Sequence, residues 1–288
     1  MVKMGGAGLA LAALGVAAAA WAGPVLAQEH GGTQVARQPW TFSGLFGEFN
    51  NNQLQRGFRV YTEICSRCHS LNRIYFRNLA DPDGPAFPVD GVKSLAATHQ
   101  VEDGPDDNGK MFKRPGTLTD AIPSPYKNDK EARAAHNGAL PPDLSLIVRA
   151  RSVENDAPFY LVPYTMVRDV LSGYQESGAD YLYAYLTGFQ EPPKGFKLGD
   201  FMQYNRVFPG HQTAMPPPFA GGDGVVKYDD GTPATVDNYA RDVTAFLAWA
   251  ADPRLEDRKR LGLLVMIYLI ITAVLLGFAK RRIWREVH

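Results

Sequence analysis

The chain has 288 residues, of which 45% are hydrophobic, and its 30 Lys plus Arg balance 30 Asp plus Glu. This composition is typical of a globular protein with one large domain or two small ones. Its two cysteines, Cys65 and Cys68, are too few for a four-cysteine zinc cluster or a wider disulfide framework.

The N-terminus has the pattern of a secretory signal. Lys3 supplies a positive charge, and an apolar stretch rich in Gly, Ala and Leu follows it as far as Ala20. The compact residues at 25–27 suit cleavage before Gln28. An uncleaved membrane anchor is the alternative, but small residues dominate the stretch and Pro24 interrupts a helix. We therefore predict that residues 1–27 are a cleaved signal peptide and that the following chain is exported.

A second apolar run lies near the C-terminus. Residues 261–279 contain no charge and would span about 28 Å as a helix, close to the thickness of the hydrocarbon core of a bilayer. A buried core helix is usually shorter and amphipathic. Basic residues flank the run equally on both sides, so the signal peptide decides the orientation. The prediction is an exported domain at 28–257, a transmembrane anchor at 258–280 and a cytoplasmic tail at 281–288.

The exported region is acidic although the whole chain is neutral. Residues 28–257 contain 22 Lys plus Arg against 29 Asp plus Glu, which gives a net charge of −7. This sign disfavours a nucleic-acid partner and favours a basic protein partner through electrostatic steering. The acidic loop at 102–107 is either part of a docking surface or a solvated turn.

Two helices are predicted at opposite ends of the exported region. Apolar residues recur every three or four positions over 53–65, and the same spacing returns over 235–250, where Thr235 can cap the helix. Gly57 lies on or beside the apolar face of the first helix. Because glycine costs roughly 1 kcal/mol relative to alanine in a helix, we expect another helix to approach closely there. The downstream segment is the candidate.

The chain between these helices is dominated by turns rich in Pro, Gly and Asp. A further helix is predicted at 181–186, and residues 225–228 are the best candidate for a short strand. The aromatic residues between Trp40 and Phe49 indicate a segment that lies over the domain. The predicted fold class is mainly α, with long loops, a short β element and one C-terminal transmembrane helix.

The motif Cys65-Ser66-Arg67-Cys68-His69 predicts covalent attachment of one haem c. Two thiols three residues apart on one helical turn can both add to the vinyl groups of one porphyrin, and His69 then binds the iron from the same side. A redox dithiol, a structural disulfide or half a zinc site are the alternatives. A zinc site needs two more ligands, and a thioredoxin-like site needs a βαβ pattern that the surrounding residues do not have.

The second axial position decides the chemistry, because methionine opposite histidine favours electron transfer at raised potential and an open position favours binding of small molecules. Met215 lies in Ala214-Met215-Pro216-Pro217-Pro218, where the prolines hold an extended, rigid loop. The residues alone leave rivals open, and these are Met111, Met166, Met202, His99, His136 and His211.

Several short motifs along the chain resemble the cytochrome c1 family. They occur at 53–61, 65–70, 103–105, 114–116, 137–145, 186–188, 214–217, 230–234 and 249–251, followed by the C-terminal span. The match runs in order over nearly the whole mature chain. The resemblance implies a cytochrome c-like (class I) haem domain of bacterial type.

The resemblance also implies roles for particular residues. His69 and Met215 match the axial iron ligands of the family, and Arg151 matches an arginine that pairs with a haem propionate, although Arg149 is close enough to take that role. Tyr61, Pro141 and Tyr181 match residues that pack near the ring, with simple core packing as the alternative. His136 replaces an asparagine that mitochondrial relatives often have, and residues 152–178 are longer than in those relatives.

The function implied by the resemblance is electron transfer. Such a chain takes single electrons from the Rieske iron–sulfur subunit of a ubiquinol–cytochrome c oxidoreductase, the cytochrome bc1 complex, and passes them to a soluble or membrane cytochrome c. The implied partners are cytochrome b and the Rieske protein in a dimeric complex of the bacterial inner membrane, with the haem domain on the periplasmic side. The alternatives are an anchored cytochrome of another respiratory or photosynthetic chain, and a haem sensor or enzyme with an open sixth position.

Overall fold

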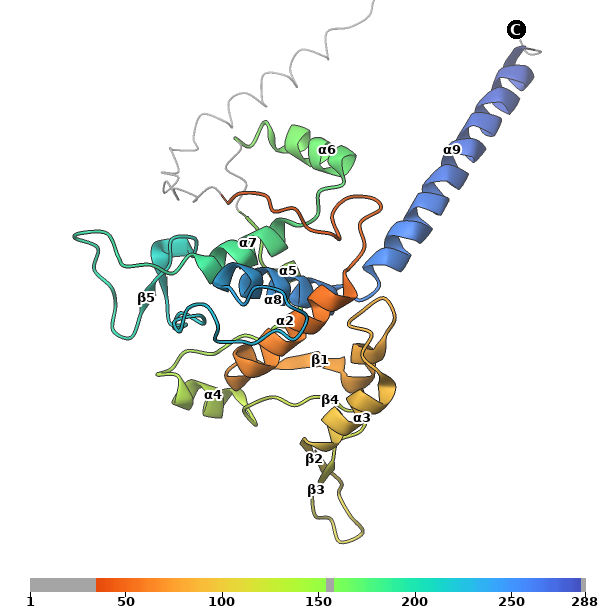
Figure 1. Cartoon of the computed structure of the whole chain (residues 1–288). Coiled ribbons are helices and arrows are strands. Elements are labelled where there is room, and N and C mark those ends of the chain that lie inside the picture. The colour runs from red at the N-terminus through yellow and green to blue at the C-terminus, as the bar shows by residue number, and fades with distance from the viewer. Residues whose placement is uncertain (1–34, 154–157, 286–288) are drawn as a thin grey trace, which may run out of the picture. The chain divides into compact units, whose positions relative to one another are not determined.

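The computed structural model describes residues 35–153 and 158–285, so the predicted signal peptide and the last residues of the predicted tail lie outside the described residues. The core is built around two helices, α2 (Asn51–Glu63) and α8 (Val236–Ala251), which pack against each other (Figure 1). Asn50 accepts a hydrogen bond from the backbone N–H of Gln53, and Thr235 accepts one from Asn238, so a side chain caps the start of each helix. Both predicted helices are confirmed, with ends shifted by two residues or fewer.

The two helices touch at Gly57. A Cβ atom added there would lie 2.0 Å from the carbonyl oxygen of Asp242 and 2.6 Å from Cβ of Phe246, both on α8. No side chain fits in this space, because real Cβ atoms do not approach other heavy atoms so closely. The expectation that Gly57 marks a close approach of the downstream helix is confirmed.

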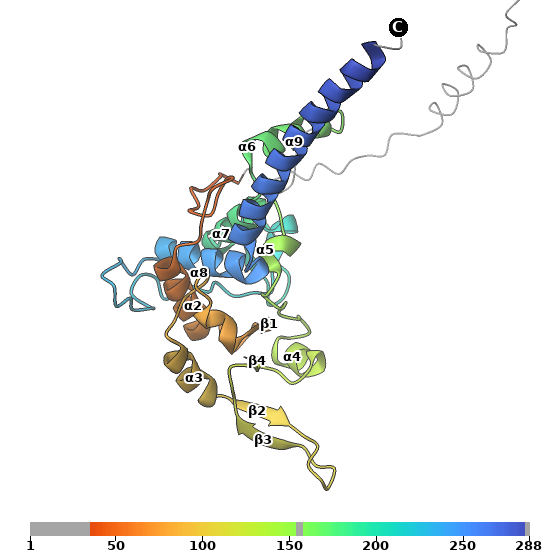
Figure 2. The same ribbon diagram turned by 90° about the vertical axis from the view of Figure 1, so that its right-hand side faces the viewer.

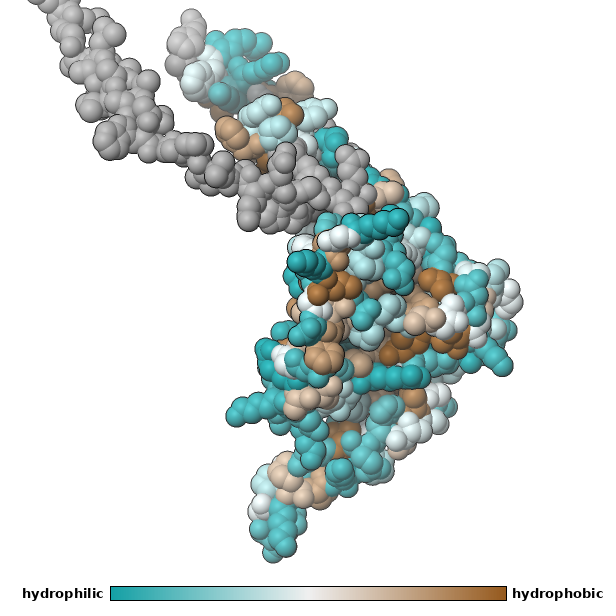
Figure 3. All heavy atoms as spheres, turned by 90° about the vertical axis from the view of Figure 1, so that its left-hand side faces the viewer, coloured by the Kyte–Doolittle hydropathy of each residue, from teal (hydrophilic) through white to brown (hydrophobic). Residues whose placement is uncertain are grey.

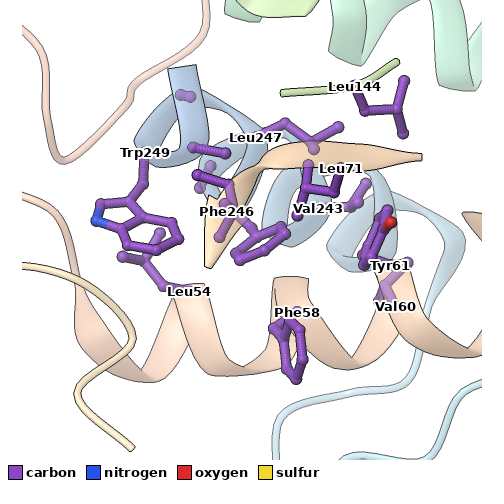
Figure 4. Close-up of a cluster of buried hydrophobic side chains, with 14 of the residues drawn as sticks. Leu54, Phe58, Val60, Tyr61, Leu71, Leu144, Val243, Phe246, Leu247 and Trp249 are labelled. Atoms are coloured by element: carbon purple, nitrogen blue, oxygen red, sulfur yellow. The ribbon is translucent and has the colours of Figure 1, made fainter. Parts of the chain in front are cut away.

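Aromatic side chains fill the space around this crossing (Figure 4). The ring of Phe246 lies 5.6 Å from that of Phe58, 5.9 Å from that of Tyr61 and 5.7 Å from that of Trp249, measured between centroids. Leu71 of the first strand is fully buried in the same cluster. Burying one such large apolar side chain stabilises the fold by about 1.5–3 kcal/mol. The end of α2 that leads into the Cys-x-x-Cys-His motif is thus fixed by the core.

The remaining helices are mostly short. Helices α5 (Ile147–Ala150) and α7 (Ser177–Thr187) pack against α8 and against each other, as Figures 1 and 2 show. The others are α3 (Val89–Ala97), α4 (Asp129–Ala135), α6 (Val162–Ser172) and the 3₁₀ helices Cys65–Arg67, Phe76–Ala80 and Pro209–His211. Helix α7 confirms the predicted helix at 181–186 and extends it at its start.

The strands of the described residues are short, and they form three separate two-stranded sheets. The three antiparallel pairs are β1 (Leu71–Tyr75) with β4 (Ala121–Ile122), β2 (Gln100–Asp103) with β3 (Phe112–Pro115), and β5 (Gln203–Tyr204) with β6 (Gln212–Thr213). Leu71 lies opposite Ile122, and both are buried. The structure is therefore mainly helical with small β elements, as the sequence predicts.

The strand predicted at 225–228 is wrong. These residues form bends and irregular chain. The hydroxyl of Tyr239 on α8 accepts a hydrogen bond from the N–H of Val226 and donates one to its carbonyl, at 3.3 and 2.8 Å. A side chain thus satisfies the backbone groups that a neighbouring strand would otherwise pair. The buried Val226 side chain explains the apolar pattern without a strand.

The aromatic segment at 40–49 covers the domain, as predicted. Trp40, Phe42 and Phe49 are buried, and the indole N–H of Trp40 donates to the carboxylate of Asp180 on α7 at 2.8 Å. The segment therefore contributes apolar side chains to the core.

On the face drawn in Figure 3, hydrophilic residues (teal) predominate and hydrophobic residues (brown) gather in a few patches.

The C-terminal helix α9 (Leu255–Arg285) contains the whole apolar run and is long and apolar enough to cross a membrane. It begins three residues before the predicted anchor and ends five residues after it. The apolar side chains at 264–271 are all exposed in the structure, so the protein itself does not bury them. This helix fits a single-pass transmembrane segment.

Candidate haem site

The Cys-x-x-Cys-His motif forms one tight turn at the end of α2. The backbone N–H groups of Cys68 and His69 both donate to the carbonyl of Cys65, at 3.1 and 2.9 Å, so the chain folds back on itself there. Both cysteines are unpaired thiols in the structure. The turn places both thiols and the imidazole of His69 on the lining of one cavity.

Burial raises the pKa of the Cys65 thiol to about 12, with a further contribution from nearby Cys68. Reactive redox cysteines have the opposite property, a pKa lowered toward or below neutrality, because the thiolate is the attacking species. The environment of Cys65 therefore does not favour the redox dithiol considered above.

His69 is 9% exposed and has one free ring nitrogen. Its Nδ1 lies 2.8 Å from the carbonyl oxygen of Pro142. Because a carbonyl only accepts, Nδ1 carries the proton and donates it, and Nε2 keeps its lone pair. Burial lowers the pKa of His69, which keeps the ring neutral, although the Pro142 carbonyl acts in the opposite direction. A neutral imidazole with a free Nε2 is the form that binds metals.

Asp143 holds the segment that carries the Pro142 carbonyl. Its carboxylate accepts hydrogen bonds from the Ser70 hydroxyl and the Asn72 N–H, both at 2.8 Å, and from the Ser145 N–H at 2.9 Å. Burial acts to raise the pKa of Asp143, but these hydrogen bonds outweigh it and leave the pKa lowered. The carboxylate thus ties the residue after His69 to the loop that orients its ring.

The cavity beside this turn has a volume of about 360 Å³, within the range of pockets that hold organic ligands. Helices α7 and α8 contribute apolar side chains to its lining, among them Leu186, Val243 and Leu247. Seven of the eight residues predicted from the sequence line it, and these are Cys65, Cys68, His69, Pro141, Arg151, Tyr181 and Met215. Tyr61, the eighth, lies behind the turn.

Met215 reaches the cavity from the proline-rich loop after β6. Its backbone N–H donates to the Thr213 hydroxyl at 3.3 Å, and the hydroxyl of Tyr185 donates to its sulfur at 3.5 Å. The hydroxyls of Tyr185 and Thr213 are also hydrogen-bonded, at 2.9 Å. Because the single proton of the Tyr185 hydroxyl points to the sulfur, Thr213 is the donor in this second hydrogen bond. Burial raises the pKa of Tyr185 and keeps this hydroxyl protonated.

Most of the rival iron ligands lie away from the cavity. Met111, Met166 and Met202 are exposed and do not line the cavity. His99 and His211 use Nδ1 for hydrogen bonds to backbone carbonyls and also lie away from it. Among the described residues, only His136 and Met215 of the rivals line the cavity. His136 shares a 2.7 Å hydrogen bond between its Nε2 and the Tyr126 hydroxyl, so that nitrogen already has a partner.

The structure separates the two candidate arginines. Arg149 forms an ion pair with Asp252 and does not line the cavity. Arg151 lies on the cavity lining and is also exposed to solvent. The geometry therefore favours Arg151 as the group that meets an anionic substituent of a bound ring.

Two predicted aromatic residues have different positions. Tyr61 is buried in the core, and its hydroxyl donates to the backbone carbonyl of His69 at 3.2 Å, so it supports the turn from behind. Tyr181 lines the cavity, and its ring is nearly parallel to that of Tyr185, with 6.3 Å between centroids. Tyr61 thus acts on the backbone of the turn, whereas Tyr181 forms part of the wall.

Sequence reasoning missed Pro142, Asp143 and Tyr185 as residues of the site. The Asp143-Leu144-Ser145 segment carries a local signal, because an aspartate often accepts from the backbone N–H two residues later. Tyr185 gives no such signal, since its spacing marks only the helix face of α7. Its contact with Met215 depends on the folding of a loop 30 residues away.

These residues fit a covalently bound haem. The turn presents two unpaired thiols, a neutral imidazole with a free nitrogen and an apolar wall, and a thioether sulfur lies on the same cavity. Thiol, imidazole and thioether are the groups that attach haem c and complete the coordination of its iron.

Comparison with known proteins gives the same result. The Cytochrome C1 family matches residues 40–287. A cytochrome c1 of Blastochloris viridis is 44% identical over 92% of this chain and 92% of its own length. A protein of Candida albicans named cytochrome b-c1 complex catalytic subunit is 40% identical over 91% of this chain and 81% of its own. The cytochrome b/c1 protein of Bradyrhizobium diazoefficiens is 48% identical over 86% of this chain, which spans 35% of that longer protein.

The family match covers most of the chain, including the haem turn, the Met215 loop and the C-terminal helix. Members of this family carry one covalently bound haem c. With the cavity and its thiols already in place, the conclusion is that the chain belongs to the cytochrome c1 family.

Proposed function

We propose that this protein is the haem subunit of a cytochrome bc1 complex and that it transfers single electrons from a Rieske iron–sulfur subunit to a soluble cytochrome c. The observation that carries the proposal is that a Cys-x-x-Cys-His turn and a methionine loop line one cavity in a chain with a membrane helix. Bound haem supplies an iron that changes between two oxidation states, one electron at a time.

In this proposal each residue of the cavity has a role. Cys65 and Cys68 form the thioether bonds, and His69 and Met215 bind the iron. The hydrogen bond from His69 to Pro142 fixes the ring and its tautomer. Tyr185 holds the sulfur of Met215 in place. Arg151 pairs with a propionate, and Pro141 and Tyr181 pack against the ring.

The apolar wall tunes the reduction potential and limits access of water. Leu186, Val243 and Leu247 on the lining come from α7 and α8, which belong to the rigid core. A nonpolar environment disfavours the iron state with the greater charge, and a methionine ligand raises the potential further. No bond of a substrate is made or broken at this site, so the chain acts as an electron carrier within an oxidoreductase.

The proposed partners are cytochrome b and the Rieske protein in a dimeric complex. Support comes from the names of relatives, one of which joins b and c1 in a single chain and another of which is a subunit of the b-c1 complex. The membrane helix α9 supplies the anchor. The proposed location is the bacterial inner membrane with the haem domain on the periplasmic side, as the predicted signal peptide requires.

A soluble cytochrome c with a basic surface is the proposed acceptor, because residues 28–257 carry a net charge of −7. The acidic loop at 102–107, which begins at the end of β2, has a structural role as well. Asp103 pairs with Arg114, and Asp106 accepts from the N–H groups of Asn108 and Lys110. The exposed carboxylates of Glu102 and Asp107 are the ones available to a partner. Transfer rates that do not change with ionic strength would contradict electrostatic docking.

The test is purification of the protein from membranes of its host with its associated subunits. We expect a reduced-minus-oxidised haem c spectrum, co-purification of a b-type cytochrome and an iron–sulfur protein, and quinol-dependent reduction of cytochrome c. Isolation with a different oxidase would indicate another electron-transfer chain. Ready binding of carbon monoxide to the reduced haem would show an open sixth position, and Met215 would then not be a ligand.

A further inference from the structure

Helix α6 presents its apolar side chains to the outside. Tyr164, Val167 and Val170 are exposed, with 80% of Val170 accessible, and Phe159 just before the helix is 88% exposed. The least exposed described side chains on the helix are Val162, Thr165 and Asp169, spaced three and four residues apart. An amphipathic helix of a water-soluble domain has the opposite orientation, with its apolar stripe on the core. The described residues leave this apolar face uncovered, so it is available to an apolar environment.

The polar side of α6 is attached to the N-terminal segment. Asp169 forms an ion pair with Arg37 at 3.0 Å, and the guanidinium of Arg37 lies 3.7 Å from the centroid of the Tyr174 ring. The helix ends at Gly173, whose added Cβ would lie 3.4 Å from Cα of Gly44. The end of α6 thus rests on the turn at 43–47.

That turn is also bound to the start of the membrane helix. The ammonium group of Lys259 donates to the carbonyl of Phe42 at 2.6 Å and to that of Gly47 at 3.2 Å. Lys259 lies two residues before the uncharged run that begins at Leu261. The same turn exposes Leu45 and Phe46, with 78% of the Phe46 side chain accessible. A second exposed apolar group therefore lies where α9 enters the membrane.

We treat these two groups as one apolar surface, defined here as Leu45, Phe46 and the exposed apolar side chains of residues 159–170. The lipid headgroup region must surround α9 near Lys259, where the charged part of that helix meets its uncharged run. Aromatic side chains are enriched at this level of a membrane, and apolar helix faces are buried in the boundary between headgroups and acyl chains. The composition of the surface, with Phe159, Tyr160 and Tyr164, matches that environment.

We propose that this apolar surface lies in the headgroup region of the lipid bilayer and forms a second, interfacial membrane attachment of the haem domain. A single helix lets a domain rotate and tilt about its tether. A second contact, held to the first through Lys259 and Arg37, fixes the side of the domain that faces the membrane. The inference depends on the membrane helix and not on the proposed route of electrons.

The test uses the full-length, haem-loaded chain in nanodiscs of phosphatidylethanolamine and phosphatidylglycerol. Two variants, Val167→Cys and Phe46→Cys, place a single reactive thiol on the surface. Phe112→Cys is the matched control, because Phe112 is also an exposed aromatic residue but lies on β3. An unchanged haem spectrum verifies folding, and rates in denaturant correct for intrinsic reactivity.

We expect a water-soluble maleimide to modify both test positions several-fold more slowly than Phe112→Cys. A benzophenone maleimide attached at Val167→Cys should form photochemical adducts with lipid. Equal alkylation rates at all three positions would overturn the proposal. Protection that appears only in the assembled complex, with adducts to another subunit and none to lipid, would also overturn it and identify a protein contact instead.

Discussion

His69 and Met215 line the same cavity, but the chain holds them by different means. The turn of His69 continues directly from α2, which is packed against α8, and Asp143 ties the following residues to the Pro142 loop with two hydrogen bonds. Met215 lies in an irregular loop whose hydrogen bonds at the sulfur and the N–H involve Tyr185 and Thr213. The histidine side continues from a helix of the buried core, whereas the methionine side is held by prolines, by two hydrogen bonds and by packing of the Met215 side chain against that core.

This difference has a functional consequence for the proposed electron carrier. A rigid histidine side keeps the haem in one place, so that the distance to electron partners stays constant. We expect substitutions at Met215 and its contacts to disturb the fold less than substitutions beneath the turn of His69, and to act mainly on the potential. Substitutions on the two sides should separate these roles.

The largest effect is expected for Met215→Leu. Loss of the thioether leaves the iron without its sixth ligand, and the potential should fall by on the order of a few tenths of a volt, because axial ligands set much of the potential of a haem. The measurement is a redox titration of the haem absorbance. Met202→Leu is the control, since Met202 lies outside the cavity and should leave the potential unchanged. An unchanged potential in Met215→Leu would show that another residue binds the iron.

A smaller effect, on stability, is expected for Asp143→Ala. The substitution removes a charged acceptor from three donors. A hydrogen bond to a charged group contributes about 1.5–3 kcal/mol to stability, and the loss is smaller where water replaces the acceptor. We expect lower stability of the histidine side in denaturant titrations followed by haem absorbance. Asp106→Ala is the matched control, because its carboxylate also accepts from backbone N–H groups but in an exposed hairpin.

The lowered pKa of Asp143 also predicts that the stability of the protein depends on pH. The folded pKa of this carboxyl is lowered from its ordinary value of 3.8, so its contribution to stability is present above that value and is lost as the pH falls through the folded pKa. The wild-type protein should lose stability more steeply below pH 3.8 than Asp143→Ala. Parallel acid titration curves for the two proteins would contradict this prediction.

Gly57→Ala tests the support beneath the histidine side. The new Cβ would lie 2.0 Å from the carbonyl oxygen of Asp242, so α2 and α8 must move apart. Overpacking of this kind costs about 1–3 kcal/mol. Gly91→Ala on α3 is the matched control, because its added Cβ has open space and alanine favours a helix by roughly 1 kcal/mol. We expect opposite changes in the free energy of unfolding, measured by denaturant titration.

The smallest effect is expected for Tyr185→Phe. The phenyl ring keeps the packing, and the substitution removes the hydroxyl that donates to the Met215 sulfur and accepts from Thr213. A neutral hydrogen bond contributes about 0.5–1.5 kcal/mol, which corresponds to a potential shift on the order of tens of millivolts for one electron. The redox titration used for Met215→Leu measures it. A loss of the methionine ligand in this variant would show that the methionine side is far weaker than we infer.

The sequence alone predicted most of the helical frame. Apolar spacing located α2 and α8, capping residues located their starts, and Gly57 indicated their crossing. The strand at 225–228 was predicted wrongly, because a buried valine in an irregular segment gives the same apolar pattern as a strand. The hydrogen bonds between Val226 and Tyr239 form only when the chain folds, so the local apolar pattern does not predict them.

For this protein, the sequence by itself determined the cofactor, the membrane helix and the family, because spacing within five residues, length of an apolar run and ordered motifs are local properties. Only the tertiary structure decided which arginine reaches the cavity, which side chains position His69 and Met215, and that the apolar face of α6 is turned outward. The physical reason is that these features depend on contacts between segments 30 to more than 100 residues apart, and the chain brings such segments together only when its core is packed.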